Sequence, residues 1–154
     1  MKSPVALSEE SFSHVVRNTP LVSIDLVIKD SEHKVLVGLR ANEPAKGYYF
    51  VPGGVIRKDE RINDAFARVL KAETGCRAGL AEARFLGVFE HLYAANRFND
   101  PAYGTHYVVI AYELLFDRRP TIVLDMQHSV VKWMGETELL SATDVHENTK
   151  AYFR

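Results

Sequence analysis

One amphipathic segment that follows a glycine pair constrains the fold of this chain most strongly. The segment runs from Asp59 to Thr74, shortly after Gly53 and Gly54, and Gly75 follows it directly. Its apolar residues recur at positions i, i+3, i+4, i+7 and i+8, and they are Ile62, Ala65, Phe66, Val69 and Leu70. This spacing predicts a helix with one buried stripe, with Asp59 as its N-cap and Gly75 just past its end. The glycine pair predicts a tight turn before the helix.

Segments of β-branched and aromatic residues lie on both sides of this helix. Strands are expected at residues 21–28, 34–40 and 48–51 before it, and at 83–93, 105–116 and 130–134 after it. Residues 29–33 have turn composition and predict a hairpin. Shorter helices are expected at 8–17, 136–141 and 145–153. This order of elements favours an α+β fold, in which a mixed β-sheet is sandwiched between helices as three α/β/α layers.

The composition restricts the classes of protein to which this chain can belong. The 154 residues suit one domain, residues 1–154, and 19 basic residues against 20 acidic ones give no basic block for a nucleic acid. No stretch approaches the ~18 apolar residues that a membrane span needs. The N-terminus lacks the apolar region of a secretory signal. Cys76 stands alone, which excludes an internal disulfide and favours a cytoplasmic location.

Charged residues recur at fixed intervals through the central segment. The run reads Gly-x5-Glu-x7-Arg-x4-Glu-x-Gly, with Glu60, Arg68 and Glu73 as its charged members. Glu73 continues the apolar row of Val69, where a carboxylate needs a partner. Carbonyls at the glycine turn and the Glu73 carboxylate are oxygen ligands of the kind that Mg²⁺ prefers. A plain strand-turn-helix with a surface glutamate is the alternative. Arg68 is expected to pair with a neighbouring glutamate and to hold the loop on the helix.

A candidate general base lies far downstream, at His128. It follows Gln127 in a segment that is expected to be a loop, where catalytic groups are common. An imidazole with a pKa near ~6.5 suits proton abstraction near neutral pH. The Gln127 amide could offer an oxygen to the metal. A solvated loop histidine is the competing interpretation.

The spaced residues of the central segment resemble the Nudix box of nucleoside-diphosphate hydrolases. Val69 and Ala72 stand where that box has glutamates, so Glu73 alone remains of that group. Further segments resemble GDP-mannose mannosyl hydrolases, a Nudix subfamily, and occur in the same order: TPLVSIDLVI, GLRANEPAKGYYFVPGG, RKDERINDAFARVLKAETG, THYVV, QH and DVHENTKAYF. The resemblance covers nearly the whole chain and implies the Nudix fold.

This resemblance also implies an activity and a set of site residues. The activity is Mg²⁺-dependent hydrolysis of GDP-mannose, or of GDP-glucose, to GDP and the free sugar, by attack of water at the anomeric carbon with inversion. The Gly53 carbonyl, Glu73 and Gln127 would hold one Mg²⁺ per active site, and His128 would be the general base. The loss of box carboxylates agrees with a single metal ion and a distant base. A homodimer is also implied.

Four further residues receive roles from the same resemblance. Arg40 would neutralise the diphosphate leaving group and Tyr107 would donate a hydrogen bond to it, while Asp25 and His91 would lie in the sugar region. Simpler interpretations remain, because Tyr107 could be a core residue and Asp25 and His91 could be ordinary strand residues.

One position departs from the subfamily. An arginine usually follows the glycine pair, but Val55 stands there and Arg57 comes two residues later. In an extended segment both side chains would point to the same side, so Arg57 is a candidate to bind substrate in place of the missing arginine.

Two other functions are compatible with the motifs. A Nudix pyrophosphohydrolase would attack phosphorus of a nucleotide sugar or nucleoside triphosphate. A non-enzymatic sensor would bind a nucleotide sugar without turnover, although retention of Glu73 and His128 favours chemistry.

Overall fold

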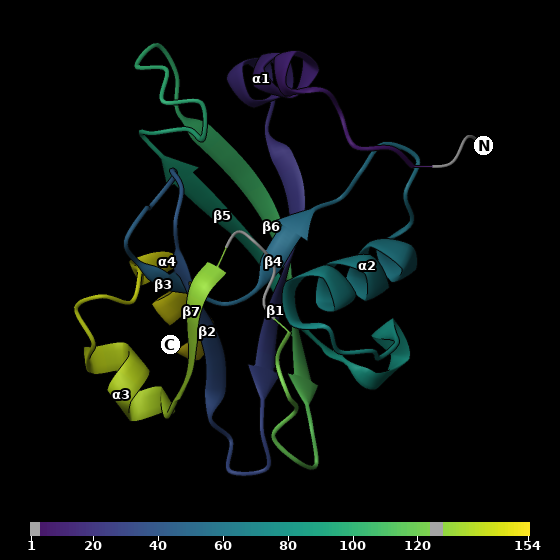
Figure 1. The fold of residues 1–154 in the computed structure, drawn as a ribbon, viewed down its shortest axis with the longest axis vertical. Coiled ribbons are helices and arrows are strands. Elements are labelled where there is room, and N and C mark those ends of the chain that lie inside the picture. The colour runs from purple at the N-terminus through teal and green to yellow at the C-terminus, as the bar shows by residue number, and fades with distance from the viewer. Residues whose placement is uncertain (1–3, 124–127) are drawn as a thin grey trace.

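A mixed seven-stranded sheet organises the protein, and the computed structural model describes residues 4–123 and 128–154. The strand order is β3-β2-β1-β6-β5, with β4 paired to β1 and β7 paired to β2 (Figure 1). The strands are β1 (Leu21–Lys29), β2 (Val35–Arg40), β3 (Tyr49–Phe50), β4 (Gly53–Val55), β5 (Arg84–Tyr93), β6 (Thr105–Leu115) and β7 (His128–Met134). Strands β1 and β6 run parallel, whereas β1·β2, β2·β7 and β5·β6 are antiparallel.

Helices cover both faces of this sheet (Figure 1). Helix α2 packs on one face, and α3 and α4 lie on the other. The helical elements are α1 (Glu9–Asn18), α2 (Ile62–Thr74), η1 (Leu80–Glu82), α3 (Glu136–Ser141), α4 (Glu147–Lys150) and η2 (Ala151–Phe153). The predicted α/β/α arrangement is therefore confirmed.

Two cores form because successive strand residues point to opposite faces. On one face, Ile24, Leu26 and Ile28 of β1 are fully buried in the cluster that contains Phe66 of α2. On the other, Val27 is buried in a second cluster. Each fully buried side chain of this size contributes about 1.5–3 kcal/mol. Strand β1 is thus fixed from both sides, which gives its polar residues a defined position.

The start of α2 differs from the prediction that Asp59 caps it. The helix begins at Ile62, and Arg61 occupies the cap position without a side-chain hydrogen bond. Asp59 has a φ of 64° and lies in a turn. The Glu60 carboxylate accepts a hydrogen bond from the Arg57 N–H at 3.0 Å, and this local bond closes the turn before the helix starts.

Two other predicted helix ends can be compared with the structure. Gly75 has a φ of 75° at the end of α2, so the predicted glycine terminus is confirmed. The helix expected at 145–153 starts at Glu147, because the His146 Nδ1 accepts a hydrogen bond from the Asn148 N–H at 3.1 Å and caps it.

The glycine pair lies in a strand, not in the predicted turn. Gly53 and Gly54 belong to β4 and pair with Asp25 and Ile24 of β1. A Cβ atom on Gly53 would lie 2.2 Å from the Asp25 Oδ1 atom and 2.8 Å from the Ile24 carbonyl oxygen. On Gly54 it would lie 3.0 Å from Val69 of α2. Glycine fits here because β1 lies so close to Gly53 and α2 so close to Gly54, and not because the backbone turns.

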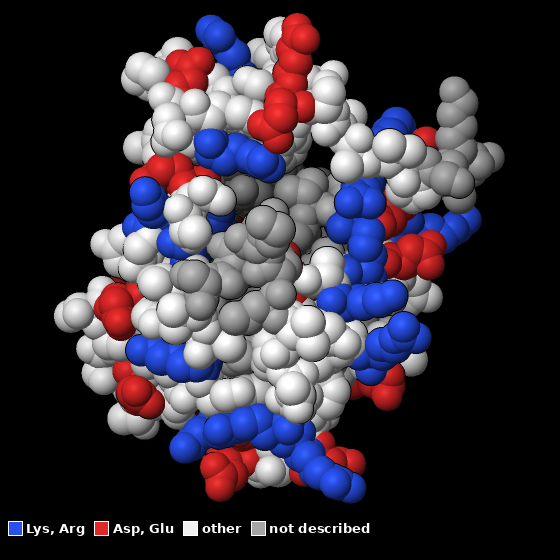
Figure 2. Space-filling model, viewed as in Figure 1, with Lys and Arg blue, Asp and Glu red and all other residues white. Residues whose placement is uncertain are grey.

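The surface carries mixed charge. Lys and Arg side chains are interspersed with Asp and Glu on the face shown in Figure 2, in agreement with the near balance of charge in the sequence. Among the residues that the structure describes, no helix is both long and apolar enough to cross a bilayer.

Candidate active site

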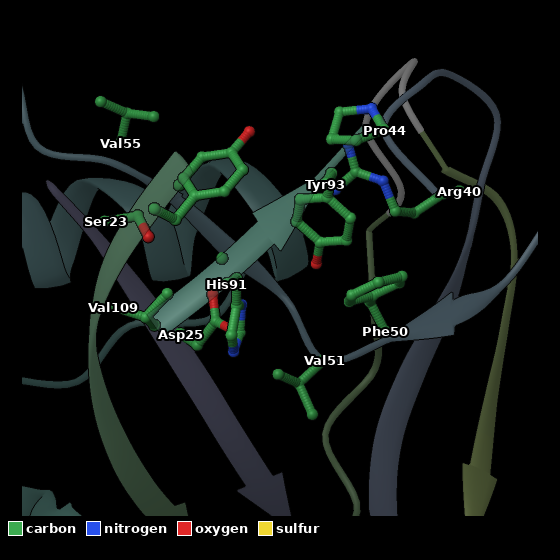
Figure 3. A pocket seen from close by; sticks show the side chains of 13 residues that line it. Ser23, Asp25, Arg40, Pro44, Phe50, Val51, Val55, His91, Tyr93 and Val109 are labelled. Atoms are coloured by element: carbon green, nitrogen blue, oxygen red, sulfur yellow. The ribbon is translucent and has the colours of Figure 1, made fainter. Parts of the chain in front are cut away.

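A cavity opens where the six strands β1 to β6 meet. Its polar and aromatic side chains come from residues far apart in the chain, and Figure 3 labels Ser23, Asp25, Arg40, Phe50, His91 and Tyr93 among them. Tyr107 and Gly53 also line the cavity. The structure therefore brings five of the predicted site residues to one place.

Arg40 supplies positive charge to this cavity. Its guanidinium carbon lies 5.5 Å from the centre of the Phe50 ring, and its Nε atom is buried without a hydrogen-bond partner among the described residues. Figure 3 shows Arg40, Phe50 and Tyr93 on one side of the cavity. A buried guanidinium nitrogen with no acceptor favours an anionic ligand, since the planar fork matches phosphate oxygens.

A carboxyl, a phenol and an imidazole form a connected group at this cavity. The Tyr152 hydroxyl donates to the Asp25 Oδ2 atom at 2.5 Å and lies 3.4 Å from the His91 Nε2 atom. Burial raises the pKa of Asp25 to about 6, although the Tyr152 hydrogen bond and the Arg40 charge oppose this increase. Burial, with His146 as a further cause, lowers the pKa of His91 to about 4, so its ring is neutral near pH 7.

Two tyrosines line the same cavity. Tyr93 and Tyr107 meet edge to face, with ring centres 6.1 Å apart. Burial raises the pKa of Tyr93 to about 12 and also raises the pKa of Tyr107, so both hydroxyls keep their protons near pH 7. Both can therefore donate hydrogen bonds to a ligand. Tyr93 was not predicted from the sequence. It lies two positions after His91 in a strand, and residues at this spacing point to the same face of a sheet.

The predicted role of Arg68 as a brace is confirmed. Its Nε donates to the Glu60 carboxylate at 2.7 Å, and its Nη2 donates to the Val55 carbonyl at 2.7 Å. The Glu60 side chain is only 3% exposed. The hydrogen bond from Arg68 is the main cause that lowers the pKa of Glu60. The pair ties α2 to the end of β4, and so to the wall of the cavity.

Arg68→Ala is expected to lower the free energy of unfolding by about 3 kcal/mol, because it leaves the Glu60 carboxylate buried and unpaired. The folded-state pKa of Glu60 is lowered, so the pair stabilises at pH values above the ordinary glutamate pKa, near ~4.3. This stabilisation is lost as the pH falls through the lowered pKa. Urea denaturation at pH 7 and pH 3 would measure both effects, and an equal loss at both pH values would contradict the account.

The three predicted metal ligands differ in where they lie in the structure. Gly53 lines the cavity, and Glu73 is half-buried in the last turn of α2. Gln127 lies outside the described residues. Among the side chains that the structure describes, in residues 4–123 and 130–154, no three from His, Cys, Asp or Glu cluster as a metal site. The Gly53 carbonyl and the Glu73 carboxylate are hard oxygen donors, so their chemistry fits a single Mg²⁺ that the substrate and water would complete.

His128 opens strand β7 and does not lie in the loop that was expected. Its backbone pairs with Arg40 across the antiparallel β2·β7 ladder. Two residues that are remote in sequence thus become neighbours at the edge of the cavity. Ladder pairing with β2 extends the strand back to this residue, which local composition did not indicate.

Arg57 is not among the residues that line the cavity, whereas Val55 is. Strand β4 ends at Val55, and the Arg57 N–H is held by Glu60 in the turn that follows. The idea that both side chains share one side depended on an extended backbone through Arg57, and the chain turns there.

Gly53→Ala is expected to reduce activity at least tenfold and to destabilise the fold by about 1–3 kcal/mol, because the new methyl group overlaps Asp25 and a β1 carbonyl. Gly135→Ala is the matched control, since a Cβ there meets nothing within 4 Å. Melting curves and initial rates would be compared for both variants. An active, stable Gly53→Ala protein would contradict the close approach.

Comparison with known proteins agrees with this geometry. The NUDIX domain family model matches residues 19–154. The chain is 40% identical over 131 residues to the low-salt glycan biosynthesis protein Agl8 of Haloferax volcanii, covering 85% of this chain and 81% of that protein. It is 38% identical over 56 residues to an ADP-ribose pyrophosphatase of Methanocaldococcus jannaschii, covering 36% of this chain and 32% of that protein.

Solved structures support the fold. The MutT protein of Methanosarcina mazei Go1 superimposes with a TM-score of 0.71 at 16% identity, covering 88% of this chain and 92% of that one. At this identity the likeness concerns the fold alone. Together with the family match over almost the whole chain, these findings show that the protein belongs to the NUDIX domain family and is a Nudix hydrolase.

Proposed function

We propose that this Nudix hydrolase cleaves GDP-mannose or GDP-glucose into GDP and the free sugar, with water attacking the anomeric carbon. The proposal rests on one observation: the Arg40 Nε atom is buried with no hydrogen-bond partner among the described residues, and Arg40 lines the same cavity as Asp25 and His91. The cavity would therefore offer a cation to the diphosphate and polar side chains to the sugar. The name of the Haloferax relative, a glycan biosynthesis protein, agrees with a sugar nucleotide as substrate.

The chain's own residues would divide the work as follows. His128 takes a proton from water as its oxygen bonds to C1 of the sugar. The bond between C1 and the phosphate oxygen breaks, and GDP departs with the electron pair. Arg40 stabilises the negative charge that develops on the diphosphate, and the Tyr107 hydroxyl donates a hydrogen bond to it.

A divalent cation belongs to this proposal, as Nudix hydrolases typically use one. The Gly53 carbonyl, Glu73 and Gln127 would hold one Mg²⁺ per site. When bound, it supplies positive charge to the diphosphate. We further propose that the protein acts in the cytoplasm as a homodimer.

A panel of nucleotide sugars, assayed with Mg²⁺ and with EDTA, tests the proposal. GDP-mannose or GDP-glucose should be the best substrate, and GDP and free sugar should appear in equal amounts only with Mg²⁺. Formation of GMP and a sugar phosphate would contradict it. That outcome would support a pyrophosphohydrolase, which the similarity to an ADP-ribose pyrophosphatase over 56 residues favours as the second candidate.

A further inference from the structure

Tyr152, near the C-terminal end of the chain, contacts two residues that line the cavity, Asp25 and His91. It belongs to η2, and its side chain packs against the core on the α3 and α4 side of the sheet. The Phe89 ring meets the Tyr152 ring edge to face, with centres 4.7 Å apart. This packing holds the ring independently of its hydroxyl. The hydroxyl can therefore hydrogen-bond to the two polar groups that it contacts, Asp25 and His91.

The proton order among these three groups follows from their chemistry. Burial and the neighbouring Asp25 raise the pKa of Tyr152, so it keeps its proton. A tyrosine hydroxyl has one proton to donate, and it donates this hydrogen bond to the Asp25 Oδ2 atom at 2.5 Å. The His91 Nε2 atom lies 3.4 Å from the Tyr152 hydroxyl oxygen. Because the one hydroxyl proton points to Asp25, the imidazole must be the donor in this contact. The order is His91 to Tyr152 to Asp25.

The other Asp25 oxygen faces β4. Its Oδ1 atom lies so near Gly53 that a Cβ on this glycine would be 2.2 Å away. With Oδ2 held by Tyr152 and Oδ1 against β4, the carboxylate has one defined orientation. A neutral imidazole with its proton on Nε2 likewise has one defined tautomer.

We propose that Tyr152 is a positioning residue, whose hydroxyl fixes the orientation of Asp25 and the tautomer of His91 so that they can bind the sugar hydroxyls of the substrate. This inference rests on the proposed function for the identity of the ligand. Its hydrogen-bond order rests on the structure alone. Tyr152 itself lies outside the set of residues that line the cavity.

Tyr152→Phe removes the hydroxyl and keeps the ring on Phe89. The kcat/KM for GDP-mannose should fall by about 10-fold to 100-fold, as for loss of a hydrogen bond to a charged group. Inhibition by GDP, which lacks the hexose of the substrate, should be unchanged. Tyr103→Phe is the matched control, because it loses one tyrosine hydrogen bond, to Ser13 at 2.7 Å, away from this cavity. It should stay within twofold of the parent protein.

A double-mutant cycle separates positioning from general loss of structure. If Tyr152 acts through Asp25, then Tyr152→Phe should change the rate less than twofold in an Asp25→Asn background. An undiminished effect there would overturn the proposal. Equal loss of GDP binding and of turnover would also overturn it, since that result indicates damage to the whole site.

Nitrogen-15 NMR of the histidine rings gives a measurement that needs no substrate. At pH 8, His91 should be neutral with its proton on Nε2, and Tyr152→Phe should shift this tautomer while Tyr103→Phe should not. A proton on Nδ1 in the parent protein, or no response to Tyr152→Phe, would overturn the hydrogen-bond order. If the tautomer responds but GDP-sugars are not hydrolysed, the proposed substrate is wrong and the linkage through Tyr152 stands.

Discussion

His128→Gln is expected to lower kcat for GDP-mannose by about 10²–10⁴-fold, the usual contribution of a positioned general base. KM should change little, because the base acts in the transition state and adds little to ground-state binding. The backbone pairing of His128 with Arg40 places the residue beside the proposed diphosphate site. Glutamine keeps a similar size and polarity but cannot take the proton from water. Steady-state kinetics of the purified variant would measure the effect.

His14→Gln is the control for this experiment. His14 is exposed on α1 and is not among the residues lining the cavity, so the same substitution there should leave kcat unchanged. A loss below threefold in His128→Gln would exclude His128 as the base.

Arg40→Gln is expected to lower kcat by about 10²–10³-fold, comparable to the loss of one preorganised donor to a developing negative charge. The guanidinium sits in the cavity over Phe50, and its Nε is buried without a partner among the described residues. Charge develops on the diphosphate as GDP leaves, so the effect should be larger on kcat than on KM. Arg40→Lys keeps the charge but not the planar fork, and should fall between the parent and Arg40→Gln.

Arg118→Gln controls for the change in net charge, because Arg118 is exposed and not among the residues that line the cavity. It should behave like the parent protein. A loss below fivefold in Arg40→Gln, or an equal loss in Arg118→Gln, would show that Arg40 does not stabilise the leaving group.

Local patterns predicted the parts of the fold that local interactions determine. The apolar stripe of α2 and the left-handed glycine at its end both follow from helical spacing and backbone sterics. Strand β4 was missed because its pairing with β1 joins residues about thirty positions apart and because a glycine pair is typical of a turn. The close approach of Gly53 to Asp25 is a tertiary fact that no local pattern contains.

In the candidate site, too, tertiary contacts could not be predicted from local sequence patterns. Resemblance to a subfamily named Asp25, Arg40, His91 and Tyr107, and the structure places all four around one cavity. Tyr152 was missed because its contact with Asp25 spans 127 positions in the sequence. An aromatic residue near a chain end carries no periodic signal for such a contact.

Hydrolysis in ¹⁸O-labelled water tests the central claim most directly, because the position of the label shows whether water attacked the anomeric carbon or a phosphorus. With GDP-mannose and Mg²⁺, mass spectrometry should find the label in the released mannose at C1 and none in GDP. Label in a phosphate group of the products would place the attack on phosphorus and contradict the account.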